Sequence, residues 1–519
     1  MLFVVAETVE NSNGSDTDLT STEQNRKEEK GRGLNSYRNI IRGSSLFGGV
    51  QVFNILISLI RGKFVAIILG PEGMGISALF NTASNTIQRF SSLGLNQSII
   101  REVSHDEDNP DYRPEVVKTS IGMTNLTALL GLLICVALCV PLSRLTFGDA
   151  SYWWQFILLG AAVWFAIAGT GKLSILQGLH EVKRISKSSI VGSLTGLCIG
   201  VPLYYIFGYK GIVPAMVAIF MALYLFYSVA LYKSIGKQQS NIFDDWKKYF
   251  PIAKKLLALG IILMSGELLA TLVAYLVNLF IRMTGGVDDV GLYQAANSLT
   301  NQFSGVIFSG LAMDYFPRLS KVASDNLKMN NAVNRQSEVV AWLMTPAMVV
   351  LILAAPLIIR VLLAESFASI IPLMRWMGLG MLLRAFSFPM AYITFAKGNK
   401  KVFFILEGVC CNILTLVLSC LFYHWFGLIG LGYALVADNG ACLLLYFIVN
   451  HRLYGYTFSR ASFFNYLGGA LLTGGCFIFS YFHSPSLSYS LMGTAAAIAL
   501  GWGFFSLKSR YTAKSEEIG

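Results

Sequence analysis

The sequence predicts an all-α integral membrane protein with fourteen transmembrane helices, arranged as two duplicated six-helix lobes plus two extra C-terminal helices. Composition is the first observation: 54% of the 519 residues are hydrophobic and 13% are charged, against about 25% charged in soluble domains. The second is an internal repeat, because residues 75–104 recur at residues 291–320 with a constant offset of 216. Two repeated multi-helix halves are typical of alternating-access transporters, whose substrate path lies between the halves.

The repeated positions include glycines and polar residues as well as apolar ones. The matched pairs are Gly75/Gly291, Asn81/Asn297, Thr82/Ser298, Gly94/Gly310, Leu95/Leu311 and Ser104/Ser320. A second set, at an offset of 219, consists of Gly208/Gly427, Gly211/Gly430, Ala215/Ala434 and Val217/Val436. The duplication therefore extends through a whole half of the membrane region.

The individual spans follow from hydropathy, since about 30 Å of hydrocarbon requires roughly 20 apolar residues of helix. They are predicted at residues 44–70, 74–100, 117–140, 152–176, 185–206, 212–232, 252–281, 288–314, 337–363, 367–395, 402–422, 428–450, 462–482 and 486–507. The polar composition of residues 1–43 predicts a disordered cytoplasmic tail. The expected domains are an N-terminal lobe (44–232), a cytoplasmic linker (233–251), a C-terminal lobe (252–450), the extra helices (451–507) and a cytoplasmic tail (508–519).

The positions of the basic residues predict the orientation, because short cytoplasmic loops keep Lys and Arg while short translocated loops lack them. With the amino terminus inside, the external loops carry just three of the 40 Lys and Arg residues: Arg144, Lys210 and Arg282. Both termini are therefore expected in the cytoplasm, with external turns near residues 71, 208 and 285. The net charge of +11 follows from this topology. The basic residues are expected to face membrane lipids, so no nucleic-acid partner is needed to explain them.

Several classes of function are disfavoured by what the loops and cysteines contain. All eight cysteines lie in predicted spans and imply no disulfide framework. The five histidines lie in loops without a partner at metal-ligand spacing, and the acidic run at residues 105–108 is expected to be a solvated loop, so no metal or other cofactor is predicted. Membrane glycan ligases and polymerases of this size carry a large external loop with catalytic residues, whereas every external loop here is short. The sequence therefore predicts a protein that is not an enzyme.

Charged residues inside the spans are the candidate functional residues, because each costs about 2.5–3.5 kcal/mol at the bilayer centre unless it faces a polar cavity or a partner. The cations are Arg61, Lys63, Arg89, Lys172, Arg375 and Arg384, and the anions are Glu267, Glu407 and Asp438. Lys172 and Glu407 lie close to the cytoplasmic ends of their spans and are expected to snorkel. The surplus of cations indicates an anionic ligand, since Arg matches phosphate oxygens with paired donors.

The duplicated hairpin contains the first candidates for substrate binding, Arg61 and Arg89, with Lys63 beside Arg61. The acids Glu267 and Asp438 are the candidates for coupling transport to a proton or sodium ion. A structural ion pair between either acid and a buried arginine is the alternative interpretation of these two residues.

Arg375 and Arg384 are further candidates for substrate binding, and they lie in the same predicted span. They are nine residues apart, which places them about half a turn out of phase on a straight helix. Such a helix directs just one of them into a central cavity, and Arg384 is the deeper of the two. Bending of the helix at Pro372 and Pro389 would bring both inward.

The first hairpin resembles a known family. Residues 61–75 read Arg-Gly-Lys-Phe-Val-Ala-Ile-Ile-Leu-Gly-Pro-Glu-Gly-Met-Gly, in which the Gly-Pro-X-Gly-X-Gly turn is the most specific part. Further similarities are the run Phe-Pro-Arg-Leu-Ser at residues 316–320 and the turns at Gly178 and Gly398. Over about residues 40–507 the chain thus resembles the bacterial polysaccharide flippases, the O-antigen and lipid III group of the multidrug/oligosaccharidyl-lipid/polysaccharide exporter superfamily.

The resemblance implies a MATE-like fold in the bacterial inner membrane, with a cationic cavity between the lobes. The implied activity moves an undecaprenyl-diphosphate-linked glycan from the inner to the outer leaflet, for surface polysaccharides such as the O-antigen of lipopolysaccharide. Arg61 and Arg89 match lumen arginines of the related lipid II flippases, whereas Ile76 stands where those relatives have an acidic residue. By analogy, the last two spans are expected to hold the lipid tail, and polysaccharide polymerase and chain-length proteins are expected partners.

A cation-coupled multidrug or metabolite antiporter of the same superfamily is the alternative function. Such an antiporter is expected to have an anionic cavity for cationic drugs, whereas the spans of this chain are rich in cations. An ion gradient or the membrane potential is the expected energy source for either function. No Gly-rich phosphate loop ending in Lys-Ser/Thr occurs in the sequence, so ATP is not expected to drive transport.

Overall fold

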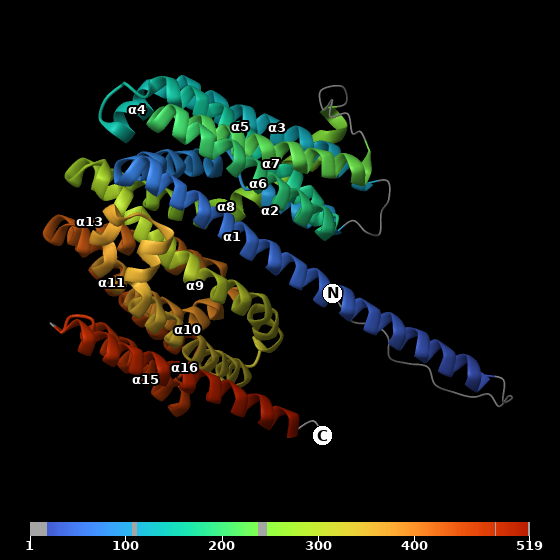
Figure 1. Ribbon diagram of the computed structural model, residues 1–519. Helices are drawn as coiled ribbons and strands as arrows, with labels where there is room; N and C mark the ends of the chain where they lie inside the picture. Colours follow the sequence, from blue (N-terminus) through green and yellow to red (C-terminus); the bar gives the residue numbers. More distant parts are fainter. Residues whose placement is uncertain (1–17, 106–111, 237–245, 483, 517–519) are drawn as a thin grey trace.

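Long helices build the whole of the described structure. The computed structural model describes residues 18–105, 112–236, 246–482 and 484–516, and within these ranges helices are joined by turns, with no strand. Figure 1 shows an N-terminal group of helices above, a C-terminal group below it, and α15 with α16 along the outer side of the C-terminal group. Most of the predicted acidic loop and the middle of the predicted linker, residues 237–245, lie outside the described residues.

The described helices lie where the sequence predicts the apolar spans. The N-terminal group contains α1 (Asp18–Ser92), α2 (Leu95–His105), α3 (Tyr112–Ala137), α4 (Cys139–Phe147), α5 (Trp153–Gly178), α6 (Val182–Phe207), η1 (Gly208–Gly211) and α7 (Ile212–Ile235). The C-terminal group contains α8 (Trp246–Gly285), α9 (Val287–Val322), α10 (Asn326–Leu362), η2 (Glu365–Ile370), α11 (Ile371–Ala396), α12 (Lys400–Phe403), η3 (Phe404–Cys411), α13 (Asn412–Phe426), η4 (Gly427–Ile429) and α14 (Gly430–Tyr454). The outer pair is α15 (Arg460–Phe479) and α16 (Pro485–Glu516).

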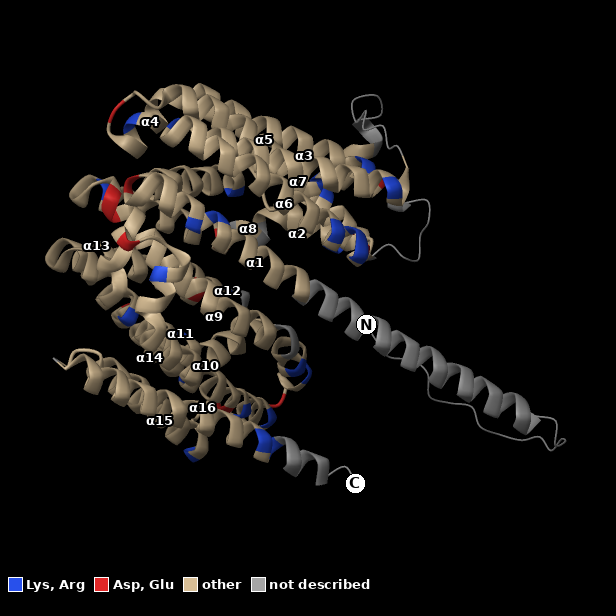
Figure 2. Ribbon diagram, viewed as in Figure 1, with Lys and Arg blue, Asp and Glu red and all other residues tan. Residues whose placement is uncertain are grey.

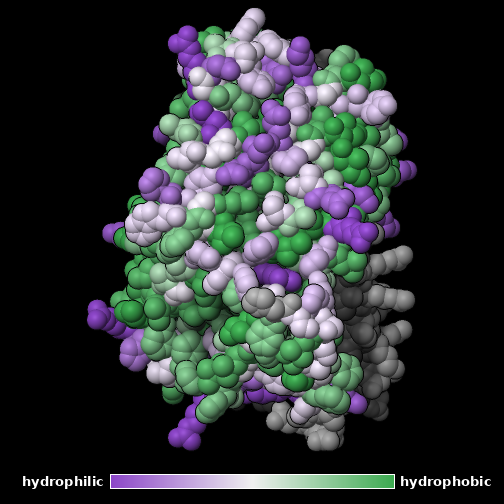
Figure 3. All heavy atoms as spheres, turned by 60° about the vertical axis from the view of Figure 1, so that its left-hand side comes forward, coloured by the Kyte–Doolittle hydropathy of each residue, from purple (hydrophilic) through white to green (hydrophobic). Residues whose placement is uncertain are grey.

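Within the described ranges, ten helical segments are long and apolar enough to cross a membrane. Three of these segments are interrupted: 49–92 by a break at Gly70, 182–235 by η1, and 401–454 by η3 and η4. Hydrophobic side chains also cover much of the face seen in Figure 3, as expected of a surface that contacts lipid. The chain is therefore an all-helical, multi-pass membrane protein.

The break in α1 and the break before α9 are equivalent positions of the repeat. Gly70 (φ 65°) and Gly286 (φ 93°) both occupy a backbone region that disfavours side chains, and they are separated by the same offset of 216. Pro71 follows Gly70 and cannot donate the backbone hydrogen bond that would continue the first half of α1. Each half of the chain therefore reverses its direction at the same point of its first helix pair.

Several boundaries differ from the hydropathy prediction, two of them in the first helix pair. Helix α1 begins at Asp18, inside the segment whose composition predicts a disordered tail, so the helix of the first span continues into a stretch rich in Glu, Lys and Arg, which are good helix formers. Residues 1–17 of that predicted tail lie outside the described residues. The second predicted span is interrupted, because Leu93 (φ 49°) and Gly94 (φ 69°) end α1 and start α2 in a new direction.

Each lobe has its own apolar core, and α8 contacts both. Phe80, Phe156 and Leu159 are fully buried in the N-terminal lobe, while a second cluster occupies the C-terminal lobe and extends to α1 through Leu79. The first turns of α8 pack in the N-terminal lobe through residues such as Leu256, and its later turns pack in the C-terminal lobe through residues such as Val277. Helix α8 thus links the lobes physically as well as in sequence.

Candidate functional site

The two lobes touch each other at the end of the molecule where Gly70 and Gly286 lie, called here the hairpin end. A Cβ atom added at Gly75 would lie 2.0 Å from the backbone oxygen of Val287, and one added at Gly291 would lie 1.9 Å from that of Pro71. Gly291 and Val287 are the repeat equivalents of Gly75 and Pro71. The contact is therefore two-fold symmetric, and it requires glycine on both sides because no side chain fits between the backbones.

Additional hydrogen bonds hold α8 against α4 near the hairpin end. The hydroxyl groups of Thr146 and Tyr275 are 2.7 Å apart in a buried position. Arg282 donates a hydrogen bond of 2.8 Å to the backbone oxygen of Leu145. The hairpin end is thus closed by backbone packing and by polar contacts between the N-terminal lobe and α8.

Towards the other end of α1, the structure pairs two of the predicted functional residues. Arg89 donates a hydrogen bond to Glu267 and forms an ion pair with it, joining α1 of one lobe to α8. Both side chains are about half exposed, at 47% and 49%, so the pair is accessible rather than buried in a packed core. Arg89 is in the last turn of α1, where a cation is favoured by the helix dipole.

Arg61 and Lys63 lie in the part of α1 that precedes the break at Gly70, and Figure 2 shows Lys and Arg on helices of both lobes. The side chains of Arg61 and Lys63 are both half-buried. A rise of 1.5 Å per residue places Arg61 about 14 Å and Arg89 about 28 Å from Gly70 along their helices. The two arginines expected to act together therefore stand at different depths, which suits successive contacts with a moving ligand better than one shared contact.

A second group of charges lies within the C-terminal lobe. Arg384 on α11 has its guanidinium carbon 5.9 Å from the centre of the Phe308 ring and interacts electrostatically with both Glu407 and Asp438. Asp438 is 7% exposed and accepts a hydrogen bond of 2.8 Å from the hydroxyl of Thr415. Glu407 belongs to η3, a π-helical segment of a kind that is frequent at functional sites. Asp438 is therefore held by a hydroxyl, with Arg384 acting at longer range.

The structure places Arg375 apart from these residues. Its guanidinium donates a hydrogen bond of 3.2 Å to the backbone oxygen of Ser480, which follows the last turn of α15. A cation at that position compensates the negative end of the helix dipole. Helix α11 therefore directs Arg375 and Arg384 to different neighbours, as expected for residues about half a turn out of phase.

The comparisons with known proteins agree with this architecture. Residues 64–372 match the family described as polysaccharide biosynthesis protein. This chain belongs to that family. The lipid III flippases of Escherichia coli (strain K12) and Shigella flexneri are each 24% identical to it over 374 residues, which cover 71% of this chain and 86% of each relative. The resemblance seen in the first hairpin is therefore confirmed.

Solved structures of other proteins are similar in fold to this chain. The lipid II flippase MurJ in an inward closed conformation matches 90% of this chain and 99% of its own, with a TM-score of 0.67 and 14% identity. An inward-facing multidrug resistance MATE family transporter matches 78% of this chain and 94% of its own, with a TM-score of 0.67 and 16% identity. With its apolar helices and flippase relatives, the protein is a multi-pass inner-membrane protein of MATE-like fold.

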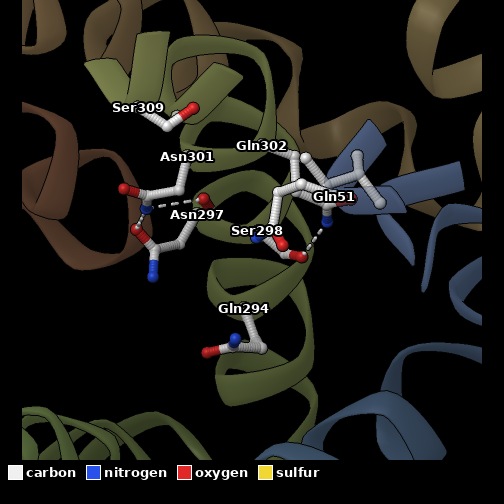
Figure 4. Close-up of a pocket in the computed structure, with 9 residues that line it drawn as sticks. Gln51, Gln294, Asn297, Ser298, Asn301, Gln302 and Ser309 are labelled. Atoms are coloured by element: carbon white, nitrogen blue, oxygen red, sulfur yellow. Dashed lines mark hydrogen bonds between the residues drawn. The ribbon is translucent and has the colours of Figure 1, made fainter. Parts of the chain in front are cut away.

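One group of polar residues was not predicted, because its side chains carry no charge. Polar side chains recur at helical spacing along one face of α9, and with Gln51 and Ile55 of α1 they line a cavity of about 340 Å³ (Figure 4). The side chains on α9 are Gln294, Asn297, Ser298, Asn301, Gln302 and Ser309. The repeat pairs Asn81/Asn297 and Thr82/Ser298 were the available signal, because they repeat polarity inside apolar spans.

Proposed function

We propose that this protein is a flippase that moves undecaprenyl-diphosphate-linked oligosaccharide from the inner to the outer leaflet of the inner membrane by alternating access. The family match and the lipid III flippase relatives support a lipid-linked oligosaccharide as the substrate class. On this proposal the protein is a non-catalytic transporter. The cationic interior favours it over the multidrug antiporter, because a cationic drug would be repelled there.

The observation that carries the proposal is the half-exposed ion pair between Arg89 of α1 and Glu267 of α8. A guanidinium held by a carboxylate at a partly open position can exchange that partner for a diphosphate, which offers the same paired acceptor geometry and more charge. We propose that Arg89 binds the diphosphate first and that Arg61, with Lys63 beside it, binds it at greater depth. Arg384 contributes from the C-terminal lobe, while Arg375 stabilises α15 instead.

The proposed topology has fourteen spans and both termini in the cytoplasm. The three interrupted segments supply two spans each, and α9, which falls outside the ten apolar segments of the described residues, supplies one more. The hairpin end is then the external side, so the contact between Gly75 and Gly291 closes the outward exit. The outer pair α15 and α16 lies outside the twelve-helix core, against α10.

Substitution of the arginines tests the substrate site. We expect Arg89→Ala and Arg61→Ala each to weaken binding of the diphosphate about ten- to hundred-fold, because each removes charge-assisted hydrogen bonds worth about 1.5–3 kcal/mol. Glycan export in cells lacking the native protein should then fall, with Arg→Lys restoring it partly since the paired geometry is lost. Arg101→Ala, an exposed arginine on α2, is the matched control. Normal export by the Arg61→Ala/Arg89→Ala double variant at normal protein level would overturn the proposal.

A further inference from the structure

We infer that the cavity between α1 and α9 binds a neutral sugar of the transported glycan. The inference rests on the proposed function and deepens it, because it gives the glycan a site of its own beside the arginines that bind the diphosphate. The volume of the cavity is about 340 Å³, at the lower end of the range of about 300–1,000 Å³ that is usual for small-ligand pockets. This size suits a monosaccharide unit.

The chemistry of the lining matches a sugar. Amide and hydroxyl side chains line the cavity, and none of its described lining residues is charged. An amide offers both donors and an acceptor, so neighbouring amides pair well with the hydroxyl and acetamido groups of a sugar. A phosphate would instead favour cations, which stand on other parts of the lobes. The cavity and the arginines are therefore complementary to different parts of one lipid-linked glycan.

Hydrogen bonds among the polar side chains of α9 fix the amides in place before a ligand binds. Asn301 donates to the side-chain oxygen of Asn297 at 2.7 Å, and Gln302 donates to the hydroxyl of Ser298 at 2.7 Å, as Figure 4 shows along the face of α9. The side-chain oxygen of Gln302 is buried and has no hydrogen-bond partner among the described residues. Because an unsatisfied buried acceptor costs about 1–3 kcal/mol, rotation of the amide towards a ligand hydroxyl that donates a hydrogen bond would be favourable.

The two copies of the repeat differ at the position that decides the ligand. The repeat equivalent of Arg89 is Gly305, which lines the cavity, and a Cβ added at Gly305 would meet nothing within 4 Å. The first copy thus presents a guanidinium where the second presents open space beside amides. Duplication followed by this divergence accounts for a charged site on α1 and a neutral site on α9.

The spacing along α1 allows one ligand to reach both sites. Ile55 lines the cavity, and Arg61 follows it by six residues, which is about 9 Å along the helix axis and about a third of a turn around it. A diphosphate near Arg61 and the sugar attached to it therefore fit within the same molecule. A ligand with this arrangement would contact both lobes, since α1 and α9 belong to different lobes.

The test compares two lipid probes, polyprenyl diphosphate without a sugar and polyprenyl diphosphate linked to N-acetylglucosamine. Binding of each is measured to the purified full-length protein in detergent and to Asn301→Ala, Gln302→Leu, Arg89→Ala and Gln97→Ala. We expect the wild type to bind the sugar-bearing probe more tightly than the bare one. Each amide variant should weaken binding of the sugar-bearing probe about tenfold, which corresponds to one lost hydrogen bond, with no change for the bare probe.

Each remaining outcome has a distinct meaning. The sugar site would be overturned if the wild type bound both probes equally, or if the amide variants bound the sugar-bearing probe as tightly as the wild type does. In either case, loss of binding in Arg89→Ala would still support the proposed flippase function. Absence of wild-type binding to either probe would overturn the proposed function and the sugar site with it. Gln97→Ala removes an exposed amide on α2, so it should match the wild type for both probes, and folding is checked by thermal unfolding of every variant.

Discussion

At the residue scale, the pair formed by Arg89 and Glu267 is better placed to regulate than to stabilise. An ion pair whose members are both half exposed contributes about 0–1 kcal/mol, so loss of the pair should hardly change the unfolding temperature. We propose that a coupling proton or sodium ion bound at Glu267 releases Arg89 for the diphosphate, and this links transport to an ion gradient. Asp438 is the second candidate for coupling. Its carboxylate is held by the hydrogen bond from Thr415 rather than by direct contact with an arginine.

We expect Glu267→Gln to separate flipping from the gradient. The neutral amide cannot hold Arg89 as an ion pair, so lipid-linked substrate should be flipped in liposomes at the same rate with and without an imposed proton gradient. The wild type should be faster with the gradient, and Glu365→Gln, a change of an exposed acid in η2, should behave as the wild type does. A full gradient response in Glu267→Gln would contradict the coupling role, and wild-type rates that ignore proton, sodium and voltage gradients would indicate passive flipping.

At the scale of elements, the symmetric contact at the hairpin end depends on two glycines. A methyl group at Gly75 or Gly291 would overlap a backbone oxygen on the opposite lobe, and backbone cannot move aside as a flexible side chain does. We therefore expect Gly75→Ala and Gly291→Ala to separate the lobes at this end and favour the state in which it is open. Gly62→Ala is the control on the same helix, because a Cβ added at Gly62 meets nothing within 4 Å.

Spin labels at Glu72 and Asp288 measure this separation, since the two residues are exposed and are repeat equivalents that flank the contact. In a background without the native cysteines, the distance between the labels should lengthen in Gly75→Ala and stay unchanged in Gly62→Ala. An unchanged distance distribution in both Gly75→Ala and Gly291→Ala would show that the contact does not control closure.

At the scale of the whole molecule, the proposed orientation places the hairpin end outside the cell. A cysteine introduced at Glu72 or Asp288 should react with a membrane-impermeant reagent added to intact cells. Lys254 lies in the early turns of α8, on the opposite side of the membrane in this topology. A cysteine introduced there should react only when the cells have been opened. Labelling of the Glu72 cysteine from the cytoplasmic side alone would reverse the orientation, although it would leave the fold unaffected.

Features that depend on local sequence were predictable. Apolar runs gave the all-helical membrane class, and Gly70 followed by Pro71 gave the reversal of the first hairpin, because hydropathy and backbone sterics act within a few residues. The start of α1 was harder, since the same charged residues that suggest disorder are also good helix formers when a stable helix follows them. The site was predicted from charged residues inside the spans, so the prediction did not include the neutral amides of α9.

The sequence by itself determined the class of the protein, its division into two repeated halves and the family to which it belongs, because composition, spacing and motifs are written along the chain. The tertiary structure decided which side chains meet. Glu267 could pair with any buried arginine until packing brought α8 beside α1 and selected Arg89, and Arg375 could face the cavity until packing placed α15 beside it. The physical reason is that contact between helices depends on how each helix is rotated about its axis, and this rotation is fixed by side chains distant in sequence.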